Sequence, residues 1–318
     1  MMSIAGIDQT IIMQVALIVR DAEAMARRYA EVFGFTQSDF QTTLTHDHTQ
    51  ATYHGQPTDA RASIAFFNIG QIQFEMIQPL DAPSVWKDQL DQHGESIHHI
   101  AFHSVNTRAS VDAFAAHGYT VTQQGLYTGQ GGMYTYLNTD RDMGITLELL
   151  ENFKGNPTFN APPFDSTLGL GTDRVVQVGL IVRDIDATAK RFVEVLGLPQ
   201  PGIIVTPGYE QVETTYHGAP SEATAKLAFF NCGQVTIELI EPDEKPSTWR
   251  KFLDQNGEGA HHIAFVVENT QRALDHLAKF GIPLEQQGLY SDRSGIYSYV
   301  DSAPVLGTTL ELLESFKQ

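Results

Sequence analysis

The chain repeats itself: residues 11–154 and 174–317 align without a gap at a constant offset of 163 residues. The two segments are identical at 66 of 144 positions, and the block Ala-Phe-Phe-Asn stands at 65–68 and again at 228–231. Such self-similarity marks a duplicated structural unit. A chain of 318 residues also exceeds the size at which a single hydrophobic core usually stops growing. We therefore expect two domains of one fold.

The segment between the repeats has the composition of a linker. Residues 153–173 are rich in glycine and proline and show no apolar periodicity. Residues that break helices and strands at this density are typical of irregular chain. The expected organisation is an N-terminal domain at 1–153, a linker at 154–173 and a C-terminal domain at 174–318.

Each domain is expected to contain two copies of a smaller unit. A β-rich run at 14–19 precedes a helix at 24–32, with Asp21 at the N-cap and Gly34 at the stop. Extended segments follow, and they lie at 52–54, 63–68 and 71–78, the last two joined as in a tight hairpin. This order is βαβββ.

The same order returns within the domain. An extended segment begins at His99, a helix at 108–117 ends before Gly118, and the last extended segment is 145–150. The chain is therefore predicted to be α+β, with four βαβββ modules.

Four polar residues occupy matched places in these modules. They are Gln14, Glu75, His99 and Glu148, and, at the same offset, Gln177, Glu238, His262 and Glu311. Gln14 and His99 open the first strands of their modules, and the glutamates lie in the last strands. Because neighbouring residues of a strand point to opposite faces, Glu75 shares a face with Gln73 and not with Phe74. We expect each set of four to face one cavity.

The surroundings of the glutamates favour a function over a solvent-exposed role. Glu148 is framed by Leu147 and Leu149. A carboxylate among large apolar residues normally needs a cation or hydrogen-bond donors to offset its desolvation.

Each domain also contains a pair of adjacent histidines, of which only one can share the cavity with the glutamates. Alignment of His99 with Gln14 selects His99 over His98, and the same argument selects His262 over His261. The remaining histidine of each pair is expected to have a structural or supporting role.

One imidazole, one amide oxygen and two carboxylates suit a divalent metal ion and leave positions for water or substrate. The two carboxylates neutralise the ion. The residue types leave Zn²⁺, Ni²⁺, Co²⁺, Mn²⁺ and Mg²⁺ open, because the affinity order does not decide which metal a cell supplies. One metal site in each domain is the leading hypothesis.

The composition argues against several classes of partner. A net charge of −18 without a run of Lys or Arg disfavours nucleic acid and anionic membranes. No apolar stretch approaches the roughly 18 residues of a membrane span, and residues 1–9 do not resemble a secretion signal, so we expect a cytoplasmic protein. The expected partner is a small-molecule substrate. A homodimer stays open, since the tandem chain already resembles a fused dimer.

Cys232 is the single cysteine, which excludes an internal disulfide. Its counterpart in the first half is Ile69. A thiol that exchanges with isoleucine is expected to be a small buried side chain rather than a nucleophile.

At these residues the chain resembles the vicinal oxygen chelate superfamily, which contains glyoxalase I, methylmalonyl-CoA epimerase, extradiol dioxygenases and antibiotic-resistance proteins. The likeness covers both halves almost entirely. Segments 94–102 and 257–265, each with its His-His-Ile-Ala-Phe, resemble the epimerase segment that precedes the second module. Segments 146–150 and 238–242 resemble strand-end ligand segments. The resemblance implies two tandem glyoxalase-like domains with cupped mixed sheets.

Within that superfamily the four residues are closer to the glyoxalase I set of Gln, Glu, His and Glu. Gln14 stands at a position commonly filled by histidine in the epimerases, and Glu75 and Glu238 stand where epimerases can carry glutamine. The separate acidic base of the epimerase would fall near Ile64 and Leu227, which cannot take that role.

The resemblance implies that the metal chelates two neighbouring substrate oxygens and stabilises an enolate or enediolate as a proton leaves the adjacent carbon. We expect Glu148 and Glu311 to act as bases, loosened from the metal as in glyoxalase I. Glu75 and Glu238 are expected to return the proton from the opposite side. The expected function is that of a metal-dependent epimerase or isomerase acting on a hydroxy-ketone, a 2-oxo compound or an acyl thioester.

Three further functions stay open. A glyoxalase I-type lactoylglutathione lyase fits the four residues equally well but needs cations for the glutathione carboxylates. An extradiol dioxygenase usually has two histidines and one carboxylate on Fe²⁺, whereas each site here has one histidine. A non-catalytic small-molecule binding protein would have no need of the four residues.

Additional polar residues that recur in both halves are candidates for the substrate pocket, although each also fits a structural role. They are Tyr53, His54, Asn68, Gln124 and Tyr134, and Tyr216, His217, Asn231, Gln287 and Tyr297 in the second half.

Segments 36–50 and 199–213 are nearly unrelated and fall beside the expected sites, so substrate preference is expected to differ between the halves. His46 and His48 have Tyr209 and Gln211 as counterparts. They therefore indicate a surface loop rather than a further metal site.

Overall fold

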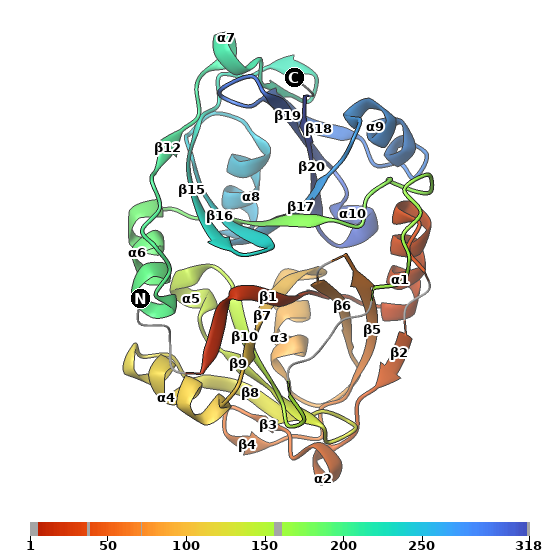
Figure 1. Cartoon of the computed structure of the whole chain (residues 1–318), viewed down its shortest axis with the longest axis vertical. Coiled ribbons are helices and arrows are strands. Elements are labelled where there is room, and N and C mark those ends of the chain that lie inside the picture. Colours follow the sequence, from red (N-terminus) through yellow and green to blue (C-terminus); the bar gives the residue numbers. More distant parts are fainter. Residues whose placement is uncertain (1–5, 37–38, 71, 156–160, 317–318) are drawn as a thin grey trace.

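Two curled sheets, one from each half of the chain, form the framework of the protein. The computed structural model describes residues 6–36, 39–70, 72–155 and 161–316. Within these residues each half forms a mixed sheet of ten strands, and the two cupped sheets stack along the long axis of the molecule (Figure 1). The prediction of an α+β fold with cupped mixed sheets is confirmed.

The N-terminal half follows the expected order, with short additions between the main strands. Its strands are β1 (Ile7–Ile18), β2 (Asp39–Thr42), β3 (Thr52–Tyr53), β4 (Gln56–Pro57), β5 (Ala62–Ile69), β6 (Ile72–Pro79), β7 (Ser96–Ser104), β8 (Val121–Leu126), β9 (Gly132–Leu137) and β10 (Thr146–Asn152). Its helices are α1 (Ala22–Phe33), α2 (His46–Thr49), α3 (Val85–His93), α4 (Thr107–Ala116) and α5 (Asp140–Met143).

The C-terminal half repeats this order element by element. Its strands are β11 (Val175–Ile181), β12 (Ile204–Val205), β13 (Thr215–Tyr216), β14 (Ala219–Pro220), β15 (Ala225–Cys232), β16 (Val235–Pro242), β17 (Gly259–Val266), β18 (Leu284–Leu289), β19 (Gly295–Val300) and β20 (Thr309–Ser315). Its helices are α6 (Ile185–Leu196), α7 (Tyr209–Val212), α8 (Thr248–Asn256), α9 (Thr270–Ala278) and α10 (Ala303–Leu306).

The first helix begins and ends at the residues that the sequence indicates. The side chain of Asp21 accepts a hydrogen bond of 2.9 Å from the backbone N–H of Ala24. Gly34 ends α1 with φ at 76°, in the left-handed region that favours glycine. Asp184 and Gly197 cap α6 in the same way.

One strand of the first module differs from the prediction. The order βαβββ predicts that segment 52–54 joins the other strands of the first module. Instead, within the described residues, β3 pairs only with the short strand β4 of that module and with β8 of the second module. β5 pairs with β6, as expected, and on its other side with β2, which the sequence did not indicate. His54 ends β3 because its φ of 45° and the φ of 75° at Gly55 turn the chain back at once. The same exchange occurs in the second half, where β13 pairs with β18.

The two modules of each half join at the centre of the sheet. The strand order is β2-β5-β6-β1-β7-β10-β9-β8-β3-β4 in the first sheet and the same in the second. β1 pairs with β6 in parallel and with β7 antiparallel, and β7 pairs with β10 in parallel. The first and last main strands of both modules therefore lie side by side.

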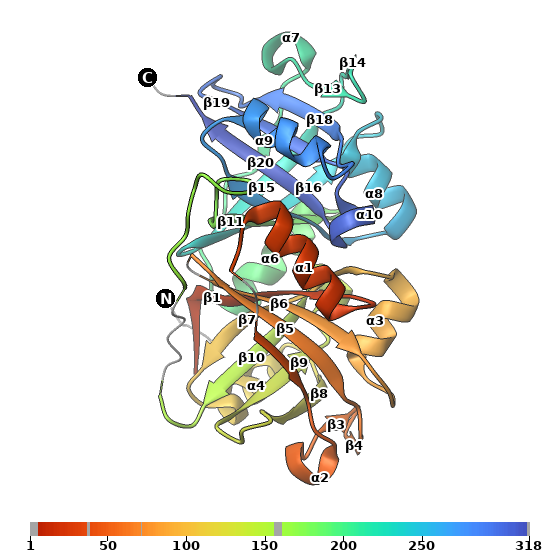
Figure 2. The same ribbon diagram turned by 90° about the vertical axis from the view of Figure 1, so that its right-hand side faces the viewer.

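The halves pack through helices and through a shared hydrophobic core. α1 of the first half contacts α10 of the second half (Figure 2). α6 of the second half contacts α5 of the first half (Figure 1). The rings of Phe33 and Phe265 lie 4.7 Å apart across the boundary, and the hydroxyl of Tyr29 donates to the carbonyl of Leu306 at 2.9 Å. Cys232 is fully buried, and its counterpart Ile69 is almost fully buried. No helix of the described residues is long and apolar enough to cross a membrane.

Candidate metal centres

The four central strands of each sheet carry the four polar residues. In the first half Gln14 lies on β1, Glu75 on β6, His99 on β7 and Glu148 on β10. Ala16 pairs with both Glu75 and His99, so these three lie in one row across the sheet. Gln14 and Glu148 both pair with Ala101 in the next row. Directly paired residues point to the same face of a sheet, so the side chains converge there.

Small residues in these rows make room for the convergence. Ala16 stands between Glu75 and His99, and its counterpart Gly179 stands between Glu238 and His262. A larger side chain at either place would fill the space that the imidazole occupies.

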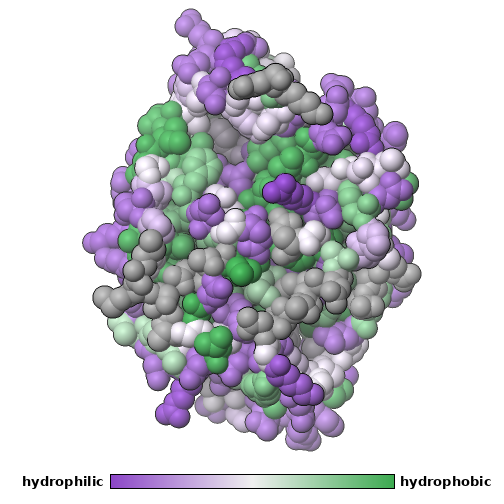
Figure 3. Space-filling model, viewed as in Figure 1, coloured by the Kyte–Doolittle hydropathy of each residue, from purple (hydrophilic) through white to green (hydrophobic). Residues whose placement is uncertain are grey.

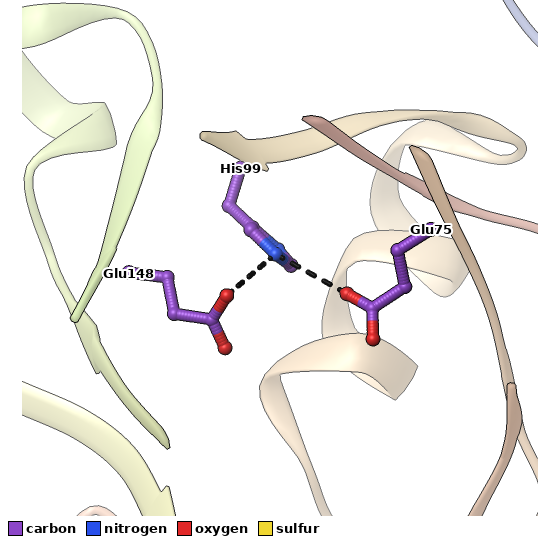
Figure 4. A group of neighbouring side chains, drawn as sticks. All are labelled: Glu75, His99 and Glu148. Carbon is purple, nitrogen blue, oxygen red and sulfur yellow. Dashed lines mark ion pairs between the residues drawn. The ribbon is translucent and has the colours of Figure 1, made fainter. Parts of the chain in front are cut away.

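The histidine of the first site lies between two carboxylates. His99 Nε2 is 3.4 Å from Glu75 Oε2 and 3.0 Å from Glu148 Oε2. The two carboxylates approach the ring from different strands and from two sides (Figure 4). Exposed fractions are 0% for His99, 6% for Glu75 and 2% for Glu148, which leaves these groups inaccessible to bulk water.

The second site repeats this geometry. His262 Nε2 is 3.5 Å from Glu238 Oε2 and 3.2 Å from Glu311 Oε2. In each domain the three potential ligand atoms lie within 4.8 Å of one another. The offset in the sequence thus becomes the same arrangement in space.

These atoms have no hydrogen-bond partner among the described residues. Glu75 Oε2, His99 Nε2 and Glu148 Oε2 are all buried without one, and so are the corresponding three atoms of the second site. Buried polar atoms without hydrogen-bond partners are costly, and three of them aimed at one point are typical of a cation-binding site. A borderline or hard divalent ion fits one imidazole nitrogen and two carboxylate oxygens. Each domain therefore contains a candidate metal centre.

The ionisable groups of each site depend on one another. Burial alone would lower the pKa of His99, but Glu148 and Glu75 outweigh it and raise the pKa to about 9. Burial raises the pKa of Glu75. His262 and Glu238 shift in the same directions for the same reasons.

The second histidine of each pair lies behind the first. His98 Nδ1 lies 2.9 Å from His99 Nδ1, so His99 is left with Nε2 for a metal. Burial, followed by the charge of His99, lowers the pKa of His98 well below its usual value. His98 and His261 both line a cavity of about 290 Å³ between the two halves, away from the metal centres.

Gln14 and Gln177 line the cavities that contain the carboxylates. The Gln14 amide nitrogen donates to Gln73 Oε1, and the Gln73 amide nitrogen donates to Asn68 Oδ1 at 3.0 Å. The first of these bonds uses the amide nitrogen of Gln14 and leaves its carbonyl oxygen as the atom available to a metal. The counterpart of Gln73 is Thr236, and Asn231 instead accepts from Gly233 N.

Each metal centre lies at the floor of a cavity. The first has a volume of about 250 Å³, and the second has about 450 Å³. Of the ten repeated residues expected in the pocket, Tyr134 and Tyr297 line these cavities. Ile64 and Leu227, which stand near the place of the epimerase base, line them as apolar wall.

The remaining eight expected pocket residues do not line these cavities. The Tyr53 hydroxyl donates to Asp88 at 2.6 Å, and the Gln287 amide donates to Ser298 at 2.7 Å. For these eight residues a role in the substrate pocket stays a prediction. They are Tyr53, His54, Asn68, Gln124, Tyr216, His217, Asn231 and Gln287.

Several wall residues were missed. The aromatic wall consists of Phe66, Trp86, Tyr127 and Tyr136, with Phe229, Trp249, Tyr290 and Tyr299 in the second half. Tyr136 lies 5.0 Å from the His99 ring and Tyr299 lies 5.1 Å from His262, between centroids. All four pairs are identical at the offset of 163, so the repeat itself was the signal that could have found them.

The divergent segments also contribute to the walls. The first cavity is lined by Gln41, Thr43, Leu44 and Thr49, and the second by Ile204, Thr206, Pro207 and Val212. The sequence placed these segments beside the sites, and the structure brings them into contact with the cavities.

A family model describes this chain twice. The model of the glyoxalase/bleomycin resistance protein/dioxygenase superfamily matches residues 13–137 and again 176–299. Among curated proteins, the uncharacterized protein YqjC of Bacillus subtilis (strain 168) is 31% identical over 106 residues, which are 33% of this chain. The match covers 66% of YqjC, slightly less than two thirds of its length.

The fold of this chain also occurs in a solved structure. A triple mutant of 4-hydroxymandelate synthase from Streptomyces coelicolor has a TM-score of 0.60 at 15% identity over 97% of this chain and 93% of that chain. A Mn(II)-bound glyoxalase from Novosphingobium aromaticivorans has a TM-score of 0.49 at 14% identity over 99% and 83%. The family model covers most of both halves, and the predicted family is thereby confirmed: the chain belongs to the glyoxalase/bleomycin resistance protein/dioxygenase superfamily.

Proposed function

We propose that the protein is a divalent-metal-dependent epimerase or isomerase that moves a proton on the carbon beside a substrate carbonyl. The observation that carries the proposal is the pair of buried carboxylates on two sides of one histidine, each with an oxygen that has no partner among the described residues. His99, Glu75, Glu148 and Gln14 would hold the metal in the first domain. His262, Glu238, Glu311 and Gln177 would do so in the second.

A bound divalent ion would supply Lewis acidity to two neighbouring substrate oxygens and so stabilise an enediolate or enolate of the substrate. Glu148 and Glu311 are the proposed bases, which take the proton. Glu75 and Glu238, whose raised pKa values favour the protonated form, would give their own proton from the other side, to the same carbon with inversion or to its neighbour. Tyr136 and Tyr299 cover the imidazoles and keep water from them.

The walls favour a neutral substrate. None of the described residues that line either cavity is Lys or Arg. The phosphates of an acyl-CoA and the carboxylates of glutathione would therefore lack a cationic partner in these walls. Aromatic and apolar side chains dominate instead. This favours an uncharged hydroxy-ketone or 2-oxo compound over an acyl thioester, and it favours the isomerase over the glyoxalase I-type lyase.

An extradiol dioxygenase and a non-catalytic binding protein fit the site less well. Two carboxylates and one histidine differ from the two histidines and one carboxylate usual for Fe²⁺ oxygenases. A non-catalytic binding protein would have no need of two buried carboxylates beside one histidine, because burying ionisable groups is costly.

Metal analysis and solvent deuterium exchange test the proposal. We expect two metal ions per chain and deuterium incorporation into neutral hydroxy-ketones, with incorporation lost in the double variant Glu148→Gln/Glu311→Gln. Less than one metal per chain, or exchange that the double variant leaves untouched, would overturn it. Exchange with inversion would select the epimerase. Formation of a thioester from methylglyoxal and glutathione would select the lyase.

A further inference from the structure

Behind the metal-facing histidine of the C-terminal domain lies a chain of polar contacts that ends on a carboxylate. His262 Nδ1 lies 3.1 Å from His261 Nδ1, and His261 Nε2 lies 3.3 Å from Thr248 Oγ1. The Thr248 hydroxyl donates to Glu285 Oε2 at 3.0 Å, and Lys251 Nζ donates to Glu285 Oε1 at 2.7 Å. We call these residues the Glu285 chain.

The Glu285 chain is shielded from water. Exposed fractions are 0% for His262, 3% for His261, 2% for Thr248 and 3% for Glu285. In such surroundings hydrogen bonds are stronger and bulk water does not compete for them. Only Lys251, at the end of the chain, reaches the surface, with 37% of its side chain exposed.

The carboxylate determines the direction of every hydrogen bond in the Glu285 chain. A carboxylate accepts, so the single hydroxyl proton of Thr248 points to Glu285, and Thr248 Oγ1 must accept from His261 Nε2–H. His261 is then a neutral ring whose Nδ1 carries a lone pair. That nitrogen accepts from His262 Nδ1–H, so Nε2 is the nitrogen of His262 that faces Glu238 and Glu311 and is left for a metal.

The N-terminal domain has the same frame without these side chains. The counterparts of Thr248, Glu285 and Lys251 are Val85, Thr122 and Asp88. The backbone is held alike, since Val85 N–H donates to Gln123 Oε1 at 2.9 Å and Thr248 N–H donates to Gln286 Oε1 at 2.9 Å. Asp88 instead accepts a hydrogen bond from the Tyr53 hydroxyl. Within the described residues, His98 is hydrogen-bonded through Nδ1 to His99, and no hydrogen bond joins it to a carboxylate.

We propose that Thr248 and Glu285 are positioning residues that fix the tautomer of His262 and make the C-terminal site the tighter of the two metal sites. This inference rests on the proposed metal sites. The physical reason is that a ligand histidine whose second nitrogen is held by a hydrogen-bond chain to a carboxylate has a fixed ring orientation, and only its Nε2 is left to exchange a proton for the ion. In the N-terminal domain no such hydrogen-bond chain of described residues determines which ring nitrogens of His98 and His99 carry the protons.

Co²⁺ titration of single-site chains measures the effect. His99→Ala leaves the C-terminal site, and His262→Ala leaves the N-terminal site. We expect the C-terminal site to bind Co²⁺ more tightly, and Thr248→Val, which installs the residue found in the other half, to weaken it by roughly 10-fold. Thr248→Ser retains the hydroxyl and should restore the affinity. The matched change Val85→Thr should leave the N-terminal site unchanged, because no carboxylate follows it.

Histidine ¹⁵N NMR of the metal-free chain gives a second readout. His261 should carry its proton on Nε2, and the Thr248→Val variant should lose that preference while keeping its melting temperature. Unchanged Co²⁺ affinity in Thr248→Val, or a His261 proton on Nδ1 in the unsubstituted chain, would overturn the inference. If Thr248→Val does not fold, the tautomer of the unsubstituted chain decides.

The two proposals fail in distinguishable ways. A folded chain whose C-terminal site binds no Co²⁺ at all would refute the proposed function and with it the affinity difference. Normal Co²⁺ binding and affinity changes without any proton exchange would refute the isomerase reaction alone.

Discussion

The two halves present the same candidate metal ligands inside different cavity walls. Where the first cavity has Gln41, Thr49 and Gln73, the corresponding residues of the second half are Ile204, Val212 and Thr236. The first cavity has a volume of about 250 Å³, and the second has about 450 Å³. Figure 3 shows hydrophobic residues gathered over the C-terminal half on one face of the molecule. Ile204, Val205 and Phe229 of this half are exposed.

The residues proposed for the reaction are therefore the same in both halves, whereas the residues that would contact the substrate differ. The metal-facing residues lie on central strands, where any shift would disturb a packed core. The wall residues that differ come mainly from segments at the rim, which tolerate change. We infer that the duplication kept one reaction and allowed two substrates, a compact polar one in the first site and a larger apolar one in the second.

The largest expected effect comes from removing one base at a time. Glu148→Gln should lower turnover of small polar hydroxy-ketones by roughly 10²- to 10⁴-fold, the usual contribution of a general base, and leave larger apolar ones untouched. Glu311→Gln should do the reverse. Steady-state rates on both substrate classes check this. If either variant slows both classes equally, the two sites are not independent.

A glycine tests how closely the second site is packed. A Cβ at Gly179 would stand 1.8 Å from Cε1 of the His262 ring, whereas the first half carries Ala16 at this place. We expect Gly179→Ala to push the imidazole aside and weaken Co²⁺ binding at the C-terminal site by about 10-fold. Ala16→Gly is the matched control and should leave the N-terminal site nearly unchanged. If both substitutions change Co²⁺ affinity equally, the side chain at position 16 or 179 does not determine where the imidazole lies.

Exchange of a wall residue should exchange preference. Gln41→Ile should shift the N-terminal site toward apolar substrates by about 10-fold, and Ile204→Gln should shift the C-terminal site the other way, as expected for one polar or apolar contact in a pocket. Competition assays with two substrates measure the ratio of kcat/KM. The unmodified site in each variant is the internal control. A preference that follows neither substitution would assign selectivity to the aromatic walls that the halves share.

The smallest expected effect is the pH dependence of stability, which should be the same for the sites of both halves. The pKa values of His99 and His262 are raised from 6.5 to about 9, so the stabilisation they provide to the metal-free chain is complete below pH 6.5 and is lost as the pH rises through 9. The raised pKa values of Glu75 and Glu238 act in the same direction. The melting temperature of the metal-free chain should fall by a few degrees between pH 6.5 and 9.

A bound ion should remove most of this dependence, since it takes the place of the protons. His99→Ala should remove about half of it if the two sites are alike in this respect. A metal-free chain whose melting temperature rises over the same range would contradict the directions of the pKa shifts.

Part of the candidate site follows from the sequence because strands obey a simple period. The alternation of Glu75 and Glu148 with apolar neighbours predicted which face of the sheet each glutamate occupies. The constant offset predicted the equivalent residues of the second half. Residue type alone did not show which repeated polar residues line a cavity, and Tyr53 and Gln124 are not among the lining residues, because a polar side chain on a strand does not reveal which partner it meets. Trp86 and Tyr136 were missed because large aromatic residues at repeated positions resemble ordinary core.

The duplication, the order of the modules and the candidate metal-facing residues could be read from the amino-acid sequence, because they depend on periodicity and on positions that recur. The neighbours of each strand could not, and neither could the pairing of β3 with the second module. Folding alone brings Thr248 and Glu285 behind His262, and Val85 and Thr122 to the corresponding places behind His99. Such contacts join residues far apart along the chain through the curl of the sheet, and no local pattern records them.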